Sequence, residues 1–137
     1  MKFVLDTNIC IFIIKQKPPQ VLKQFKNYEA EDIGISAITL AELQFGVVKS
    51  QHREKNQQAL NEFILPLAVL EFNSEAAFVY GEVRAGLTRT GQLIGALDML
   101  IAAQALSANA TLVTNNVREF ARVTGLRVEN WIEPSIS

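Results

Sequence analysis

The chain has 137 residues, of which 49% are hydrophobic and 20% charged, a composition typical of one globular domain and unlike that of disordered or fibrous proteins. Thirteen basic and 14 acidic residues give a net charge of −1, which argues against a surface built for polyanions in general. The apolar run at residues 9–14 is far shorter than the roughly 20 residues of a membrane helix. Asp6 and Asn8 interrupt the apolar stretch that a signal peptide would need. Cys10, the single cysteine, has no disulfide partner in the chain, so we expect a cytoplasmic protein without membrane contact.

The first half of the chain alternates short apolar strands with helices. Residues 2–5 are predicted to form a strand, and residues 8–14 then turn helical. The proline pair at residues 18–19 breaks the chain and can begin a second helix that runs to about residue 26. A second strand at residues 33–36 leads into a helix at residues 38–48.

The second half continues this alternation. We expect, in order, a helix at 54–64, a strand at 67–72, a long helix at 74–90 capped by Ser74, a helix from about 98 to 107, a strand at 111–114 and a short strand at 127–131. Strands that alternate with helices are joined by right-handed crossovers and form a parallel sheet covered on both faces. The sequence therefore predicts an α/β fold with four to five parallel strands and no linker that would divide the chain.

Three acids occupy positions where a carboxylate needs a partner. Asp6 directly follows the first predicted strand, and the carboxyl edge of a parallel sheet is where ligands bind. Glu42 lies in an apolar helix, and the residues three and four positions away offer no cation. Asp98 begins another apolar helix. Together they predict a site built from carboxylates, which is suited to a divalent cation.

Each acid also has a purely structural explanation. Asp6 and Asp98 are both placed to cap the helix that follows them. Thr39 and Glu42 match a capping box, in which two side chains bond to backbone N–H groups at the start of a helix. These roles stay open beside the metal site.

Other catalytic chemistry finds little support in the sequence. The single histidine, His52, excludes a mechanism that uses two histidines as acid and base, and no G-x-S-x-G turn accompanies it. Cys10 lies in an apolar helix without a nearby histidine, as a buried thiol does. Neither a Walker A loop nor a G-x-G-x-x-G loop occurs. A metal held by carboxylates is the mechanism that remains.

Four segments carry a resemblance to a known family. They are VLDTN at 4–8, ITLAEL at 38–43, DMLIAA at 98–103 and LVTNNVREF at 112–120. In order and spacing they resemble the motifs of PIN domains, and within that family the VapC toxins of bacterial toxin–antitoxin pairs, in particular the enteric-type subgroup. The resemblance implies a three-layer α/β/α sandwich and a single PIN domain over residues 1–137.

The resemblance also implies a set of metal ligands. Asp6, Glu42 and Asp98 fall on the three principal acidic positions of the family, which hold Mg²⁺ or Mn²⁺. A fourth acidic position is common in the family, and here it is occupied by Asn116. Its amide oxygen can bind the ion or a coordinated water, but it adds no charge, so a second tightly bound metal is doubtful.

Three further residues enter the site on the same resemblance. Glu119, one turn after Asn116, could supply a carboxylate, or it could be an exposed charge beside Phe120. Thr7 and Thr114 would orient ligands or water through their hydroxyl groups.

The implied function is that of a toxin which cuts looped or single-stranded RNA, with transfer RNA as the favoured substrate. A metal-activated water would attack the phosphodiester in line and leave a 5′-phosphate and a 3′-hydroxyl. Without the three principal acids, 13 basic residues face 11 acidic ones, which permits a nucleic-acid substrate without predicting it. The implied partners are a VapB-type antitoxin and a second copy of the chain in a homodimer, with operator DNA reached only through the antitoxin.

Two alternatives from other classes remain. A metal-dependent phosphatase also places an aspartate after its first strand, but it usually needs a second acid nearby and a lysine on a late strand, where this chain has Asn8 and the residues TNN at 114–116. The other alternative is a binding module with little catalytic activity, for which Asn116 is the argument. Metal-dependent cleavage of RNA would distinguish the toxin from both.

Overall fold

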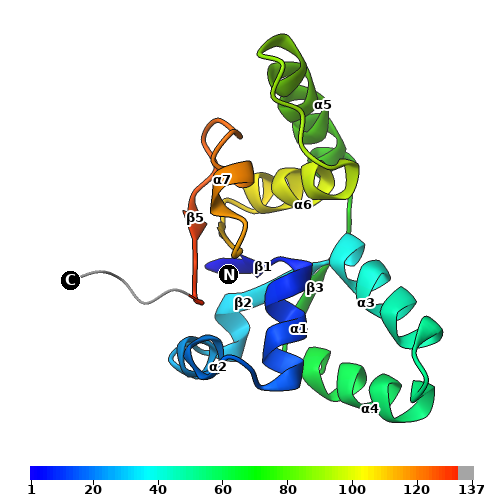
Figure 1. Cartoon of the computed structure of the whole chain (residues 1–137). Coiled ribbons are helices and arrows are strands. Elements are labelled where there is room, and N and C mark those ends of the chain that lie inside the picture. Colours follow the sequence, from blue (N-terminus) through cyan, green and yellow to red (C-terminus); the bar gives the residue numbers. More distant parts are fainter. Residues whose placement is uncertain (133–137) are drawn as a thin grey trace.

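A computed structural model describes residues 1–132 and shows one parallel sheet at the centre of the molecule (Figure 1). Its strands are β1 (Phe3–Leu5), β2 (Ile33–Ser36), β3 (Ala68–Leu70), β4 (Thr111–Val113) and β5 (Val128–Glu129), in the spatial order β3-β2-β1-β4-β5. In the central strand, Val4 is paired with Gly34 on one side and with Leu112 on the other. The strand order reverses between β1 and β4, and open α/β sheets bind ligands at such a point, beyond the carboxyl ends of the strands.

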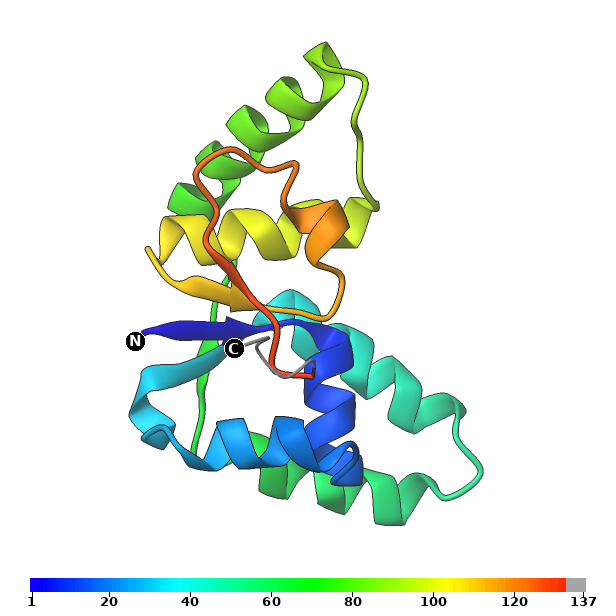
Figure 2. The ribbon, with the colours of Figure 1, turned by 60° about the vertical axis from the view of Figure 1, so that its left-hand side comes forward.

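Helices cover both faces of this sheet. They are α1 (Thr7–Lys15), α2 (Pro19–Lys26), α3 (Ala37–Lys49), α4 (Arg53–Ile64), α5 (Ser74–Arg89), α6 (Ala96–Ser107) and α7 (Val117–Phe120), and a short 3-10 turn, η1 (Ala30–Asp32), precedes β2. Helices α1, α2 and α4 lie on one side of the sheet, α6 lies on the other, and α5 packs on the outside of α6 (Figures 1 and 2). The predicted three-layer α/β/α sandwich is confirmed.

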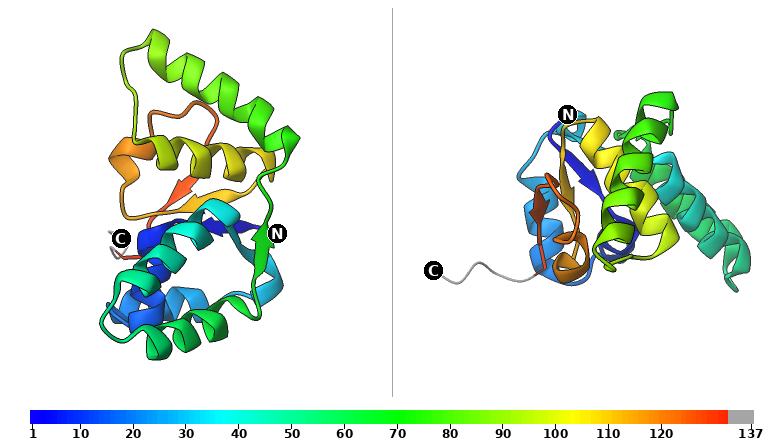
Figure 3. Two further views of the ribbon diagram at one scale, coloured as in Figure 1. Left: turned by 90° about the vertical axis from the view of Figure 1, so that its right-hand side faces the viewer. Right: turned by 90° about the horizontal axis from the view of Figure 1, so that it is seen from above.

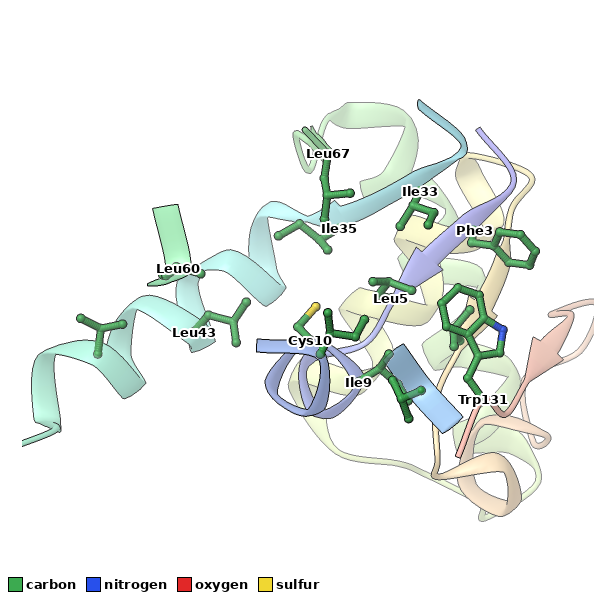
Figure 4. Packing of buried hydrophobic residues seen from close by; sticks show 14 residues of the cluster. Phe3, Leu5, Ile9, Cys10, Ile33, Ile35, Leu43, Leu60, Leu67 and Trp131 are labelled. Atoms are coloured by element: carbon green, nitrogen blue, oxygen red, sulfur yellow. The ribbon is translucent and has the colours of Figure 1, made fainter. Parts of the chain in front are cut away.

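Successive strand residues point to opposite faces and build two cores. Leu5 and Ile35 join α1, α3 and α4 in one cluster (Figure 4), whereas Val4 and Leu112 join α5 and α6 in the other. These strand residues are fully buried, as expected of a parallel sheet with both faces covered. Each buried aliphatic side chain stabilises the fold by about 1.5–3 kcal/mol.

Two helix starts differ from the capping predictions. Helix α6 begins at Ala96 with Gly95 as its N-cap, so Asp98 is the third helical residue and does not cap the helix. The cap of α3 is Ser36, whose side chain accepts a hydrogen bond from the backbone N–H of Ile38. Glu42 therefore lies in the second turn, and the predicted capping box is wrong. In both cases the helix starts earlier than the apolar pattern indicated.

Other differences are smaller. Asn73, and not Ser74, caps α5, because the Asn73 side chain accepts a hydrogen bond from the backbone N–H of Ala76. The predicted strand at 127–131 shortens to two residues, and Trp131 turns into the core instead. Helix α7 was not predicted as a separate element. Within residues 1–132, none of the helices combines the length and apolar character needed to span a membrane, and residues 133–137 of the predicted domain lie outside the described part.

Candidate active site

Asp6 lies where the central strand ends, and only 6% of its surface is exposed. Its Oδ1 accepts the backbone N–H of Ile9 at 2.9 Å, and its Oδ2 accepts the hydroxyl of Thr114. Burial raises the pKa of Asp6, the two hydrogen bonds lower it, and the negative charge of Glu42 raises it again. The predicted cap of α1 is confirmed, and the same carboxylate lies at the carboxyl edge of the sheet, where ligands bind in open α/β folds.

Glu42 reaches the same region from α3. Its Oε1 accepts the hydroxyl of Thr7 at 2.6 Å, and Thr7 is the residue next to Asp6. The hydroxyl of Thr7 thus holds Glu42 beside the first turn of α1. Because Glu42 is half-buried and its charge acts on Asp6, the two carboxylates lie in one electrostatic environment.

Asp98 joins this group from the first turn of α6. Its pKa rises from 3.8 to about 6, first because it is buried and then because of the charge of Glu119 and a hydrogen bond with Glu119. The charges of Asp6 and Glu42 raise the pKa of Asp98 further. The charges of the two other predicted acids and of Glu119 therefore all act on Asp98.

Glu119 is held in place by two donors. Its Oε1 accepts the backbone N–H of Gly95 at 3.1 Å, and its Oε2 accepts the side-chain amide of Asn116. The backbone N–H of Asn116 donates to the hydroxyl of Thr114 at 2.9 Å, which in turn donates to Asp6. Glu119 is half-buried and belongs to the acidic group, and the side chain of Asn116 supports it (Figure 3, left, shows α7 beside the start of α6).

Gly95 is a site residue that the sequence analysis missed. Besides holding Glu119, it leaves room for Asp98, because a Cβ atom at this position would lie 3.3 Å from Oδ2 of Asp98. The sequence offered only a weak signal, a glycine three residues before an acid. A backbone N–H that holds a carboxylate has no residue type of its own, so no motif could reveal it.

The acidic group is suited to a hard cation. Among residues 1–132 a single ion pair occurs, between Lys2 and Asp32 at 3.9 Å, so no basic side chain there neutralises the four acids. In the same part of the chain, no three acids converge closely enough to enclose an ion as they stand. Mg²⁺ does not require this, because it keeps several waters and is usually bound through one or two carboxylates. The donors present, all of them oxygen atoms, fit such an ion.

Comparisons with known proteins place these features in a family. A family model described as PIN domain matches residues 3–126. The chain is 46% identical over 131 residues to the tRNA(fMet)-specific endonuclease VapC of Shigella flexneri. The alignment covers 96% of this chain and 98% of that protein. It is 44% identical over 132 residues to ribonuclease VapC2 of Rickettsia felis, again covering 96% of this chain and 98% of that protein.

Solved structures agree with the sequence comparisons. DNA-bound VapBC from Salmonella typhimurium superposes with a TM-score of 0.91 at 44% identity, covering 96% of this chain and 98% of that one. VapBC2 from Rickettsia felis, bound to a DNA fragment from its promoter, gives a TM-score of 0.90 at 43% identity and covers 96% and 99% of the two chains.

Proposed function

The chain belongs to the PIN domain family and to its VapC ribonucleases, and we propose that it is the toxin of a toxin–antitoxin pair and acts as a metal-dependent endoribonuclease. The observation that carries this proposal is the group of four acids at the carboxyl edge of the sheet, without a neutralising cation among residues 1–132. Relatives from Shigella and Salmonella are named tRNA(fMet)-specific endonucleases, which supports transfer RNA as the substrate.

In this proposal Asp6, Glu42 and Asp98 hold Mg²⁺ or Mn²⁺, and Glu119 adds a fourth negative charge. A bound ion of this kind lowers the pKa of a coordinated water and stabilises charge on the phosphate. The hydroxyl groups of Thr7 and Thr114 keep the carboxylates of Glu42 and Asp6 in position. In-line attack by water at the phosphodiester leaves a 5′-phosphate and a 3′-hydroxyl.

The replacement of a common family acid by Asn116 does not favour an inactive binding module. The Asn116 amide donates to Glu119, and the Glu119 carboxylate acts on Asp98. A fourth carboxylate is therefore present, supplied one turn later in the chain. Because the loss of that acid was the argument for a binding module, catalysis is the better supported function.

The antitoxin would bind in a groove between α1, α3 and α4, with a volume of about 330 Å³. Its walls are mainly apolar and include Ile11, Ile14, Leu43, Gly46 and Leu60. Glu42 also lines this groove, so an amphipathic helix laid in it could bring an arginine to the acids. Next to it, Phe45 and Val48 of α3 are 65% and 45% exposed. We propose a VapB-type antitoxin at this groove, contact with operator DNA through that antitoxin, and a homodimer of the toxin.

Brief induction in a bacterial host tests this function. We expect growth arrest and one new set of RNA 5′ ends, in the anticodon loop of a transfer RNA, with no such ends for Asp98→Asn. Coexpression of the protein encoded next to the toxin gene should restore growth and give a complex on a sizing column. Growth arrest that persists with Asp98→Asn would contradict the proposal, as would the absence of any complex.

Gly95→Ala should slow RNA cleavage about tenfold without unfolding the protein. The new Cβ would press on the Asp98 carboxylate, and displacements of a few tenths of an ångström at a reacting centre have effects of this order. The backbone of Gly95, with φ −54° and ψ 146°, accepts alanine without strain. Gly81→Ala in α5 is the control, because its Cβ would meet nothing within 4 Å. Equal cleavage rates for both variants would contradict the positioning role of Gly95.

Asn116→Asp should destabilise the metal-free protein and tighten Mn²⁺ binding. The substitution replaces the amide that donates to Glu119 with a second carboxylate, which costs about 1 kcal/mol of unfolding free energy. The added charge strengthens the attraction for a cation. Thermal unfolding in EDTA measures the loss of stability, and calorimetry measures Mn²⁺ binding. The control is Asn115→Asp, which makes the same change at the neighbouring exposed residue. Unchanged Mn²⁺ affinity would mean that Asn116 lies outside the ligand shell.

A further inference from the structure

A second cavity, of about 470 Å³, lies on the opposite side of the sheet from the groove between α1, α3 and α4. It is bounded by the last turns of α5, the end of α6 and the loop after α7, which reaches over α6 toward α5 (Figures 1 and 2). Its polar lining consists of Glu82, Arg89, Thr90, Gln92, Arg122 and Thr124. Two arginines, two hydroxyls, one amide and one carboxylate therefore line the same cavity.

The charge distribution along the chain favours an anion in this cavity. Five of the six arginines lie between residues 84 and 127, and the acids in that stretch are Asp98 and Glu119, which belong to the acidic group. Neither Arg89 nor Arg122 forms an ion pair within residues 1–132. The acid on the cavity wall, Glu82, is exposed and lies seven residues, about two helical turns, before Arg89 on α5. Both guanidinium groups are thus available to an external anion.

The cavity is connected to the acidic group by two hydrogen bonds. Arg122 donates to the carbonyl oxygen of Leu93 at 3.3 Å, and Gly95 donates to Glu119 at 3.1 Å. Gln92 lines the cavity and Gly95 contacts the acidic group, so their Cα atoms are at most about 11 Å apart, the span of three extended residues. A nucleic-acid strand held at the acids can therefore reach the cavity within a few nucleotides.

We propose that this cavity binds the backbone of the RNA substrate, with Arg89 and Arg122 contacting a phosphate that lies a few nucleotides from the bond to be cut. This inference rests on the proposed function, because it assumes an RNA substrate at the acids. Arginine suits the role because its planar group donates two parallel hydrogen bonds to phosphate oxygens. The contact positions the strand and reads no sequence.

The salt dependence of RNA binding tests the proposal. In an Asp98→Asn background, which prevents cleavage, the affinity for a transfer RNA pool is measured over a range of salt concentrations. Arg89→Gln and Arg122→Gln should each reduce the slope of log K against log[salt] by about 0.7 to 0.9, the contribution of one phosphate contact. In the otherwise native enzyme, both substitutions should raise KM and leave kcat unchanged, and Arg89→Lys should retain the slope.

Arg127→Gln is the matched control. Arg127 is bound to the carbonyl oxygen of Asn109 at 2.8 Å, at the opposite edge of the sheet from the acids, and its replacement changes the net charge by the same amount. An unchanged slope and KM in Arg89→Gln would overturn the inference. The proposed function would stand in that case, because the protein would still cleave RNA. An equal loss of slope in Arg127→Gln would also overturn the inference, since the effect would then reflect overall charge. A native protein that cuts no RNA would instead overturn the proposed function.

Discussion

Asp6→Asn is expected to reduce RNA cleavage about a thousandfold and to leave the protein folded. Loss of the charge removes several kcal/mol of support for a bound cation and for the phosphate it stabilises, and about 4 kcal/mol corresponds to three orders of magnitude in rate. The fold should survive because the side-chain oxygen of asparagine can still accept the N–H of Ile9 and cap α1. Single-turnover cleavage and thermal unfolding measure the two outcomes.

The chain provides its own control for this substitution. It contains three aspartates, Asp6, Asp32 and Asp98, and Asp32 lies at the opposite edge of the sheet beside Lys2. Asp32→Asn makes the same chemical change away from the acidic group, so its cleavage rate should equal that of the native protein. Equal cleavage rates in Asp6→Asn and Asp32→Asn would show that Asp6 is not part of the active site.

Asp98→Asn is expected to stabilise the metal-free protein at neutral pH. The pKa of Asp98 is raised from 3.8 to about 6, so the folded state holds this proton more tightly than the unfolded chain does. The resulting stabilisation is complete below about pH 4 and is lost as the pH rises through 6. A shift of this size corresponds to about 3 kcal/mol in a buried site, which solvent screening of the half-exposed Asp98 reduces to about 1 kcal/mol.

Urea unfolding between pH 4 and pH 8 in EDTA measures this effect. The native protein should lose stability over that range, and Asp98→Asn should lose about 1 kcal/mol less. Adding Mn²⁺ should stabilise the native protein most above pH 6, where Asp98 is ionised, and should stabilise the variant less. Parallel pH profiles for the two proteins would show that Asp98 is not held among other carboxylates.

Most of the fold was predictable because local signals agreed with each other. The apolar strand at Phe3–Leu5, the proline pair before α2 and Gly91 after α5 each mark an element or its end. The order β3-β2-β1-β4-β5 was not specified by any local pattern, since it depends on how distant strands pair. The short α7 and the two-residue β5 are set by packing around Phe120 and Trp131, which periodicity does not reveal.

The sequence predicted those members of the candidate site whose carboxylates lie within apolar segments. Asp6, Glu42 and Asp98 stand out because their sequence neighbours are apolar. Glu119 lies next to Arg118 in a more polar segment, and the groups that hold it beside the others, Gly95 and Asn116, are 24 and three residues away. The capping predictions failed for Glu42 and Asp98 because residues before the apolar pattern begin those helices.

The most direct test of the central claim is cleavage of a transfer RNA pool by the purified protein, with Mg²⁺ and with EDTA, followed by analysis of the new ends. We predict cleavage that depends on Mg²⁺, yields 5′-phosphate and 3′-hydroxyl ends and is absent from Asp6→Asn at the same protein concentration. Cleavage that continues in EDTA and in Asp6→Asn would contradict a mechanism based on these carboxylates.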